Sequence, residues 1–388
     1  MKRYFPAILF ILIFAVVICS GCGLTPKETE PPPPTDPPPT QIPPTEPPPT
    51  AAVVIATQEI TPEPLPTEPQ AASVPTSLGT INSQSVVLLE RLVQIDIDNI
   101  TDLEFSPDAQ YLRMRIGFPR ETHTDIFMDI TLGKEVFRLD GNQKVYFNPN
   151  STTIASLDGN SLVEYDLRTG EALSGYNSRN EVAALSPGGQ WLIVFEEIDE
   201  DGPGTTFQIV DISTEEVIHR VFVNAVLHKE DFKFSADGEL LAATYKVPPN
   251  SYVTTFWSIE TGKAVHSLYG YSEITFHPTP YTIWLAASNA EQDYISIYEI
   301  GTWERRRYLG SALDGPNYYD VGITSYGGLI YALYDGLATY PWFWYPPTGE
   351  RTYWMSNVDL TAITISPTSK MMATADKRGY VLLWGIPQ

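Results

Sequence analysis

The sequence predicts an all-β fold, a seven-bladed β-propeller made of four-stranded blades. A strand–turn–strand unit that reads Phe-Ser-Pro-Asp at residues 105–108 returns six times along the chain, at intervals of 38 to 49 residues. Most copies are followed by two further strand patterns, and the last copy by only one. An internal repeat of this length with β-type sequence is typical of propellers, in which one repeat forms one blade.

The first 22 residues have the form of a secretory signal that ends at a lipid attachment site. Lys2 and Arg3 precede an apolar run over residues 7–18, which is shorter than the roughly 20 residues that cross a bilayer. Residues 19–22, Cys-Ser-Gly-Cys, resemble the lipobox of bacterial lipoproteins, with Cys19 where that motif usually has leucine. The resemblance implies that Cys22 is acylated and anchors the protein to the outer face of a bacterial membrane, in the cell envelope. An uncleaved anchor and an ordinary cleaved signal are the alternatives.

Residues 23–79 predict a disordered Pro/Thr-rich tether. Of the 34 prolines in the chain, 18 lie between Pro26 and Pro75. Proline lacks an amide donor and fixes φ, so this stretch favours extended polyproline II over helix or sheet. At about 3.1 Å per residue, some 50 residues reach on the order of 150 Å. We interpret the segment as a spacer between the anchor and the propeller; a tail without a selected length is the alternative.

The propeller is expected to occupy residues 80–388. Residues 81–90 predict either a strand or a short helix that Ser83 caps, with Val86, Val87 and Leu89 turned inward. The alternating residues 92–97 predict a strand. Turns between the first and second strands of the seven blades are centred on Ser106, Asn148, Ser186, Ser235, His277, Ser325 and Ser366.

Third and fourth strands complete the blades. Third strands are predicted at residues 125–130, 162–167, 207–212, 255–259, 295–300, 342–345 and 380–386. A glycine follows four of them, as in Thr169-Gly170, because glycine supplies the positive φ of a tight reversal. Fourth strands are predicted at residues 135–139, 217–221, 264–268, 306–309 and 351–355.

The two ends of the propeller region complement each other. The last unit stops after its third strand, and the unmatched strand at residues 92–97 lies just before the first unit. Pairing the two would close the ring, since propellers leave only short, protected sheet edges. We therefore expect the N-terminal strand to complete the last blade.

The repeats resemble the WD-repeat family. The resemblance rests on residues 105–108, on Tyr165-Asp166 followed by Thr169-Gly170, and on Trp257 followed by Thr261-Gly262; it covers residues 91–388. The repeats are degenerate, because the Gly-His of the family is absent and its Trp-Asp pair survives only in part. The resemblance implies a WD-type propeller whose blades depend more on apolar packing than on the family's polar network.

Charge and cysteine content argue against a nucleic-acid partner and against disulfides in the propeller. The net charge is −23, to which the N-terminal basic pair contributes +2 and the tether −6, so that the propeller carries −19. Such an acidic body repels phosphate backbones, and we expect no nucleic-acid partner. The only cysteines, Cys19 and Cys22, lie at the N-terminus, so we expect no disulfide in the propeller, which we take to be a monomer.

No catalytic or metal motif stands out in the sequence. The five histidines are not paired at metal-ligand spacing, and no Gly-x-Ser-x-Gly elbow or phosphate-binding glycine loop is present. The acidic run at residues 196–201 holds Glu197, Asp199 and Asp201 at alternate positions before a glycine, an arrangement similar to a calcium loop. Calcium is therefore the one candidate cofactor, and a solvated acidic hairpin is the alternative interpretation.

Binding is expected on the face opposite the Ser-Pro turns, where the long connections meet. Candidate residues in these loops are Glu196, Glu200, Tyr252, Tyr318 and Tyr319; loops that are merely tolerated are the alternative. The aromatic residues of the sixth unit, among them Trp342 and Trp344, predict either core between blades or a shelf on which sugars stack.

We expect a non-catalytic module that binds or scaffolds an unidentified protein or envelope polymer. A propeller hydrolase or lyase with its site in the central channel, and a glycan-binding module, are the alternatives.

Overall fold

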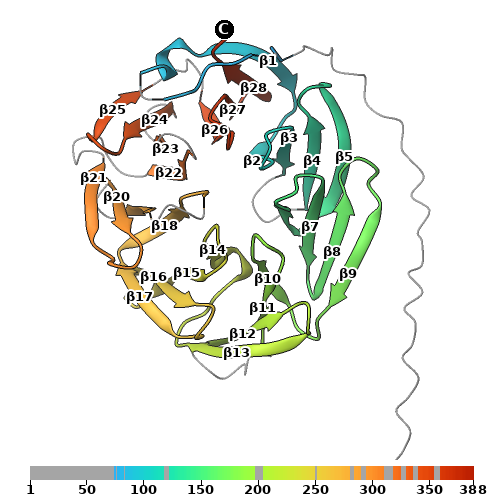
Figure 1. Ribbon diagram of the computed structural model, residues 1–388, viewed down its shortest axis with the longest axis vertical. Helices are drawn as coiled ribbons and strands as arrows, with labels where there is room; N and C mark the ends of the chain where they lie inside the picture. The colour runs from blue at the N-terminus through green and yellow to red at the C-terminus, as the bar shows by residue number, and fades with distance from the viewer. Residues whose placement is uncertain are drawn as a thin grey trace, which may run out of the picture. The chain divides into compact units, whose positions relative to one another are not determined.

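The computed structural model describes residues 74–75, 77–82, 84–117, 122–196, 204–249, 251–279, 284–289, 294–309, 318–324, 329–334, 340–353 and 359–388. These residues form seven antiparallel four-stranded sheets, which surround a common centre as the blades of a propeller (Figure 1). The predicted fold class is therefore confirmed.

In each blade the strands follow one another from the centre to the rim. Blade 1 contains β2 (Ile100–Phe105), β3 (Tyr111–Ile116), β4 (His123–Asp129) and β5 (Lys134–Gly141); blade 2 contains β6 (Lys144–Phe147), β7 (Thr153–Asp158), β8 (Ser161–Asp166) and β9 (Ala172–Asn177); blade 3 contains β10 (Val182–Leu185), β11 (Trp191–Phe195), β12 (Thr205–Asp211) and β13 (Glu216–Val223); blade 4 contains β14 (Phe232–Phe234), β15 (Leu240–Val247), β16 (Ser251–Ser258) and β17 (Ala264–Tyr269). Blade 5 contains β18 (Tyr271–Phe276), β19 (Trp284–Asn289), β20 (Tyr294–Glu299) and β21 (Arg305–Leu309); blade 6 contains β22 (Tyr318–Ile323), β23 (Ile330–Tyr334), β24 (Tyr340–Tyr345) and β25 (Glu350–Tyr353); blade 7 contains β26 (Leu360–Ile365), β27 (Met371–Asp376), β28 (Tyr380–Gly385) and β1 (Glu90–Asp96).

The N-terminal strand closes the ring as predicted. β1 pairs antiparallel with β28, with Ile95 opposite Val381 and Asp96 opposite Tyr380. The pairing extends upstream of β1, where Leu78 forms a bridge with Pro387 and the amide of Gly79 donates to the carbonyl of Ile386 at 2.8 Å. The paired segment thus begins two residues before the predicted boundary at residue 80.

A short 3₁₀-helix, η1 (Val86–Leu88), lies between this segment and β1. Val86 and Leu89 are buried, but Val87 is 60% exposed, so the prediction that all three point inward is wrong for Val87. A 3₁₀-helix has three residues per turn, and residues i and i+3 therefore share a face. Val86 and Leu89 meet this spacing and pack into the core between blades 6 and 7.

A buried hydroxyl organises the turn between the first two strands of a blade. The Oγ of Ser106 accepts the amide of Tyr111 at 2.9 Å, and its own amide donates to the carbonyl of Tyr111 at 2.9 Å. Ser186, Ser235 and Ser366 make the same pair of bonds to the residue five positions ahead. In blade 6 this role belongs to Thr324, whose Oγ1 accepts the amide of Leu329 at 3.1 Å, so centring that turn on Ser325 was wrong by one residue.

Turns with positive φ join the third and fourth strands. Gly170 and Gly262 have φ of 72° and 65°, and each donates its amide to the carbonyl four residues earlier at 2.8 Å. The first-to-second and third-to-fourth turns lie on one face of the ring, the short-turn face. Because neighbouring strands are antiparallel, the other connections lie on the opposite face, the long-loop face.

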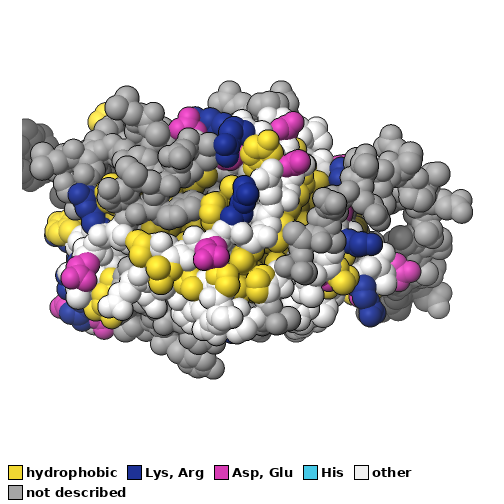
Figure 2. Space-filling model, turned by 90° about the horizontal axis from the view of Figure 1, so that it is seen from above, with side chains coloured by type: hydrophobic (Ala, Val, Ile, Leu, Met, Phe, Trp, Pro, Cys, Tyr) yellow, Lys and Arg dark blue, Asp and Glu magenta, His cyan; other side chains and the backbone are white. Residues whose placement is uncertain are grey.

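The core consists of seven clusters of buried apolar side chains, one at each interface between neighbouring blades of the described chain. The largest fully buried side chains include Phe127 between blades 1 and 2, Phe207 between blades 3 and 4, and Trp344 between blades 5 and 6. On the side of the molecule seen in Figure 2, apolar side chains lie among separate charged residues of both signs.

Candidate functional site at the centre of the ring

The inner strands of blades 1 to 5 line a cavity of about 770 Å³ at the centre of the ring. Its wall contains apolar side chains such as Val145 and Phe232, and it also contains a set of charged groups. The charged side chains that line it are Asp102, Glu104, Arg113, Arg115, Lys144 and Lys233. This cavity is therefore the first place to look for binding or chemistry.

Arg113 is the hub of the charged groups. It projects from β3 and is only 6% exposed. Its guanidinium contacts the carboxylate of Asp102, lies 3.1 Å from that of Glu104, and donates to the carbonyl of Val145 in blade 2 at 2.9 Å. A buried guanidinium is stable only when carboxylates and carbonyls replace its water. These partners meet that requirement.

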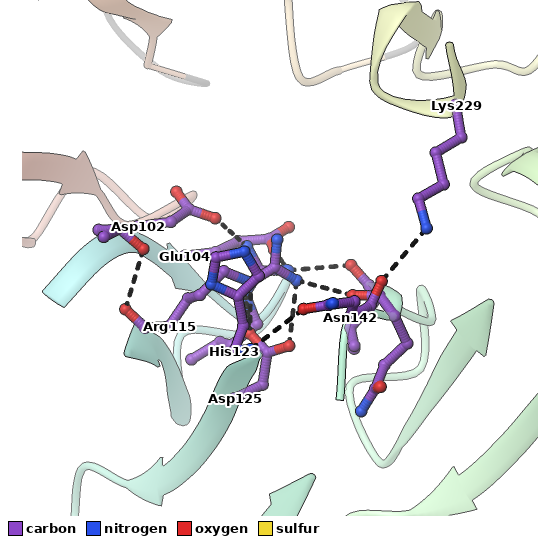
Figure 3. Close-up of polar contacts among 11 residues, drawn as sticks. Asp102, Glu104, Arg115, His123, Asp125, Asn142 and Lys229 are labelled. Carbon is purple, nitrogen blue, oxygen red and sulfur yellow. Dashed lines mark hydrogen bonds and ion pairs between the residues drawn. The ribbon is translucent and has the colours of Figure 1, made fainter. Parts of the chain in front are cut away.

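Asp125 forms the second part of the cluster (Figure 3). This aspartate is fully buried on β4, and Arg115 donates two parallel bonds of 3.0 Å to its carboxylate. Arg115 also donates to the carbonyl of Gln143 at 3.2 Å, which links blade 1 to the chain entering blade 2. Bidentate pairs of this kind fix geometry as well as neutralise charge.

The cluster shifts the proton affinities of its members. Burial raises the pKa of Glu104 above its ordinary value, and the attraction of Arg113 offsets this only in part. Burial alone would lower the pKa of Arg113, but the carboxylates of Glu104, Asp102 and Asp125 outweigh it and raise the pKa. Glu104 lies deep in the ring with its side chain 44% open to the cavity, so it can exchange a proton with a bound molecule or with water.

Lysines connect blades across the cavity through main-chain carbonyls. Lys144 of blade 2 donates to the carbonyl of Lys229, in the connection between blades 3 and 4, at 2.9 Å, and to that of Phe232 in blade 4 at 3.2 Å. Lys229, on the 3₁₀-helix η2 (Lys229–Asp231), reaches back to the carbonyl of Asn142 at 3.2 Å (Figure 3). Lys233 donates to the carbonyl of Ile274 in blade 5 at 2.9 Å. These bonds brace the inner strands against each other.

This central cluster is not predicted from the sequence. A signal was present, because Lys144 and Lys233 interrupt otherwise apolar inner strands and must face away from the core. Their partners lie 41 to 88 positions along the chain, and the sequence alone does not show which of them meet.

A second concave feature lies on the long-loop face between blades 3 and 4. This groove has a volume of about 600 Å³ and is lined by Val226 and His228 from the connection between the blades, and by Lys246, Pro248 and Tyr252 from the β15–β16 hairpin. Val226 is 61% exposed, and the ammonium of Lys246 lies 5.0 Å from the ring centroid of Tyr252. Aromatic, apolar and cationic side chains thus share one recess.

The predicted loop residues are only partly where they were expected. Glu196 follows β11, and its Oε1 accepts bonds of 2.7 Å from Gln208 and Arg220. Tyr252 lies within β16, opposite Lys246, rather than in the preceding loop. Tyr318 and Tyr319 are the first residues of β22 and are paired with Tyr334 and Leu333, so their assignment to a loop was wrong. The hydrogen-bonded pairing of β22 with β23 extends to Tyr318 and Tyr319 because β23 continues far enough to pair with them.

Of the two interpretations of the sixth-unit aromatics, core between blades is confirmed and the sugar-stacking shelf is wrong. Trp342 is 8% exposed and Trp344 is fully buried, and both pack in the core between blades 5 and 6. Their rings stack on each other with centroids 6.4 Å apart. Alternate residues of β24 face the neighbouring blade, which places both indoles in that interface and away from solvent.

Other predicted sites lie outside the described residues. These are Cys22 and the acidic run with Glu197, Asp199, Glu200 and Asp201. Within the described ranges, no group of three or more His, Cys, Asp or Glu side chains is arranged to hold a metal ion. The same part of the chain contains no helix long and apolar enough to span a membrane.

Comparison with known proteins agrees with the architecture. No protein-family model matches the chain, and no curated protein sequence matches it. Among solved structures, the β-propeller domain of Cps50 (Swd1) from Myceliophteria thermophila is similar, with a TM-score of 0.58 and 14% sequence identity. The match covers 76% of this chain and 99% of that domain. The chain is thus a seven-bladed β-propeller similar in fold to the β-propeller domain of Cps50 (Swd1).

Proposed function

We propose that this protein is an envelope lipoprotein whose propeller is a non-catalytic binding and scaffolding module. The observation that carries the proposal is the groove between blades 3 and 4 on the long-loop face. It combines the exposed Val226 with Tyr252 and Lys246, and aromatic and apolar side chains in a recess are the residues that anchor protein partners.

The central cluster supports the same proposal. The guanidinium groups of Arg113 and Arg115 are engaged by carboxylates and carbonyls, and Lys144 and Lys233 are engaged by main-chain carbonyls outside their own blades. Such bonds hold the ring rigid, and a rigid ring suits a platform on which a partner docks.

The lipid anchor is tested by metabolic labelling with a clickable fatty acid. The wild-type chain and the Cys19→Ala variant should be labelled, and Cys22→Ala should not be. Equal labelling of Cys22→Ala would refute the anchor.

The partner surface is tested by photo-crosslinking in cells that carry the full chain. A photoreactive amino acid in place of Tyr252 should give a discrete crosslinked species. The control is the same replacement at Leu132, which is 58% exposed in a turn of the short-turn face. Crosslinks that form equally at both positions, or at neither, would contradict the proposal.

A channel hydrolase or lyase is the second candidate, favoured by Glu104. This carboxyl group faces the central cavity with a raised pKa, as a general acid would. A panel of chromogenic esters and glycosides tests the candidate: turnover that Glu104→Gln abolishes would support it, and no turnover would reject it.

A further inference from the structure

A pocket rich in tyrosine lies at the rim of the ring and shares no lining residue with the channel or with the groove. It is bordered by the outer strand β17 of blade 4 and by β20 and β21 of blade 5, which are neighbours in Figure 1. Its volume is about 530 Å³, within the range of small-ligand sites. Its lining includes Tyr269, Tyr271, Tyr294, Tyr298 and Arg305.

The floor of the pocket is a fixed set of tyrosine hydroxyls. The Oη of Tyr271 lies 2.7 Å from the Oη of Tyr298 and 3.0 Å from the Oγ of Ser296, and both tyrosines are buried. Burial raises the pKa of Tyr294 to about 12 and raises that of Tyr298 as well. These hydroxyls keep their protons at neutral pH. Tyr271 donates its proton to Ser296 and Tyr298 donates its proton to Tyr271, so their oxygens meet a ligand as acceptors.

One aromatic ring of the lining, that of Tyr269, and one ring beside the lining, that of Tyr308, are open to solvent. Tyr269 is 70% exposed at the end of β17, and Tyr308 is 50% exposed on β21. The ring of Tyr308 is held on two sides, by Tyr294 with centroids 4.8 Å apart and by the guanidinium of Arg305, 3.8 Å from its centroid. The exposed ring of Tyr269 offers stacking surface in the pocket. The ring of Tyr308 offers it beside the pocket at little cost in side-chain entropy, because its neighbours hold it in place.

The charge of the pocket is small and positive. Burial lowers the pKa of His266, which stacks on Trp303 with centroids 4.6 Å apart, so this imidazole is neutral at pH 7. Of the described lining residues, Arg305 alone then carries a formal charge. On a propeller with a net charge of −19, this pocket is a place where a neutral or acidic ligand is not repelled.

We propose that this rim pocket binds carbohydrate. A pyranose ring has apolar C–H faces that stack on tyrosine, and its hydroxyls need both donors and acceptors. The pocket supplies the exposed ring of Tyr269, hydroxyl oxygens that accept, and the guanidinium of Arg305, which donates. A protein partner would need a surface of about 800 Å², whereas this recess has the size of one or two sugar residues. The proposal does not depend on the lipid anchor or on the groove between blades 3 and 4.

The test is binding of the full-length chain to immobilised hexasaccharides of glucose, xylose, mannose, N-acetylglucosamine and galacturonic acid, measured by biolayer interferometry. At least one of these probes should bind, and Tyr269→Ala and Tyr308→Ala should each weaken that binding at least tenfold. Both side chains are exposed, so these variants should keep the melting temperature of the wild type. The matched control, Phe222→Ala, removes an equally exposed ring on β13 and should bind like the wild type.

Three outcomes would overturn the proposal. The first is that no hexasaccharide binds at millimolar concentration. The second is that the variants of Tyr269 and Tyr308 bind as well as the wild type does. The third is capture of a protein from envelope extract that Tyr269→Ala abolishes while no saccharide binds, which would assign the pocket to a protein partner.

Discussion

Replacing Arg113 by methionine removes the cation that three carboxylates share inside the ring. Breaking a buried ion pair from one side costs about 3–5 kcal/mol, because the remaining charge stays buried without a partner. Here Asp125 keeps both bonds from Arg115, and the side chains of Asp102 and Glu104 are 42% and 44% exposed. The cost of losing the ion pairs should therefore lie near the lower end of this range. The carbonyl of Val145 also loses its donor, at about 1 kcal/mol. We expect a total loss of about 3–4 kcal/mol.

Urea unfolding at pH 7, followed by tryptophan fluorescence, measures this loss. With a slope of about 3 kcal/mol per molar for a domain of this size, the midpoint should fall by roughly 1 M. The control is Arg306→Met, which removes a rim arginine that pairs with Glu299 and Glu304 and is 48% exposed. A surface pair of this kind contributes about 0–1 kcal/mol, so the control should stay close to the wild type.

The pH dependence checks the electrostatic origin of the effect. The pKa of Glu104 is raised in the folded protein, so Glu104 takes up its proton at a higher pH when folded than when unfolded. Burial of the charged carboxylate therefore opposes folding above the folded-state pKa. This penalty is lost as the pH falls from the folded-state pKa to the unfolded-state pKa. The difference in free energy of unfolding between Arg113→Met and the wild type should therefore decrease as the pH falls from 7 to 4. A loss under 1 kcal/mol at pH 7, or a gap that widens on acidification, would refute the reasoning.

Three further tests address the fold. Ile95→Asp places an unpaired charge at a side chain of β1 that is 4% exposed, and it should lower the free energy of unfolding by more than about 4 kcal/mol. The control Gln94→Asp, on the exposed side of the same strand, should lower it by under about 0.5 kcal/mol. Equal midpoints of the two variants in urea would contradict ring closure by β1. Ser366→Ala removes the buried hydroxyl that accepts the amide of Met371 at 3.0 Å and should cost about 1–3 kcal/mol, and a variant as stable as the wild type would show that the turn does not need it. Trp344→Ala leaves a cavity at a fully buried site and should lower the free energy of unfolding by about 3–5 kcal/mol, measured by thermal unfolding. A negligible loss would contradict the burial of this indole in the core.

Much of the architecture was readable from the chain because its determinants are local. The hydroxyl of Ser106 bonds the amide only five residues ahead, and Gly170 closes a turn onto the carbonyl four residues behind, so each turn carries its own signal. Ring closure was readable for a different reason: the extra strand before the first unit matches the missing strand after the last. The one-residue error at Thr324 arose because threonine supplies the same hydroxyl as serine, while Ser325 is the residue that matches the repeat by name.

Sequence by itself therefore determined the all-β class, the number of blades and the identity of the closing strand, since these depend on turn chemistry and on a period repeated seven times. Only the tertiary structure decided which polar side chains meet. Arg113 contacts a carbonyl 32 positions away, Lys144 contacts one 88 positions away, and the rim pocket combines strands of two blades. These contacts depend on the angle and spacing between blades, which the packing of the whole ring sets. The same packing buries Trp344 and leaves Tyr269 exposed, although both are aromatic residues in strands.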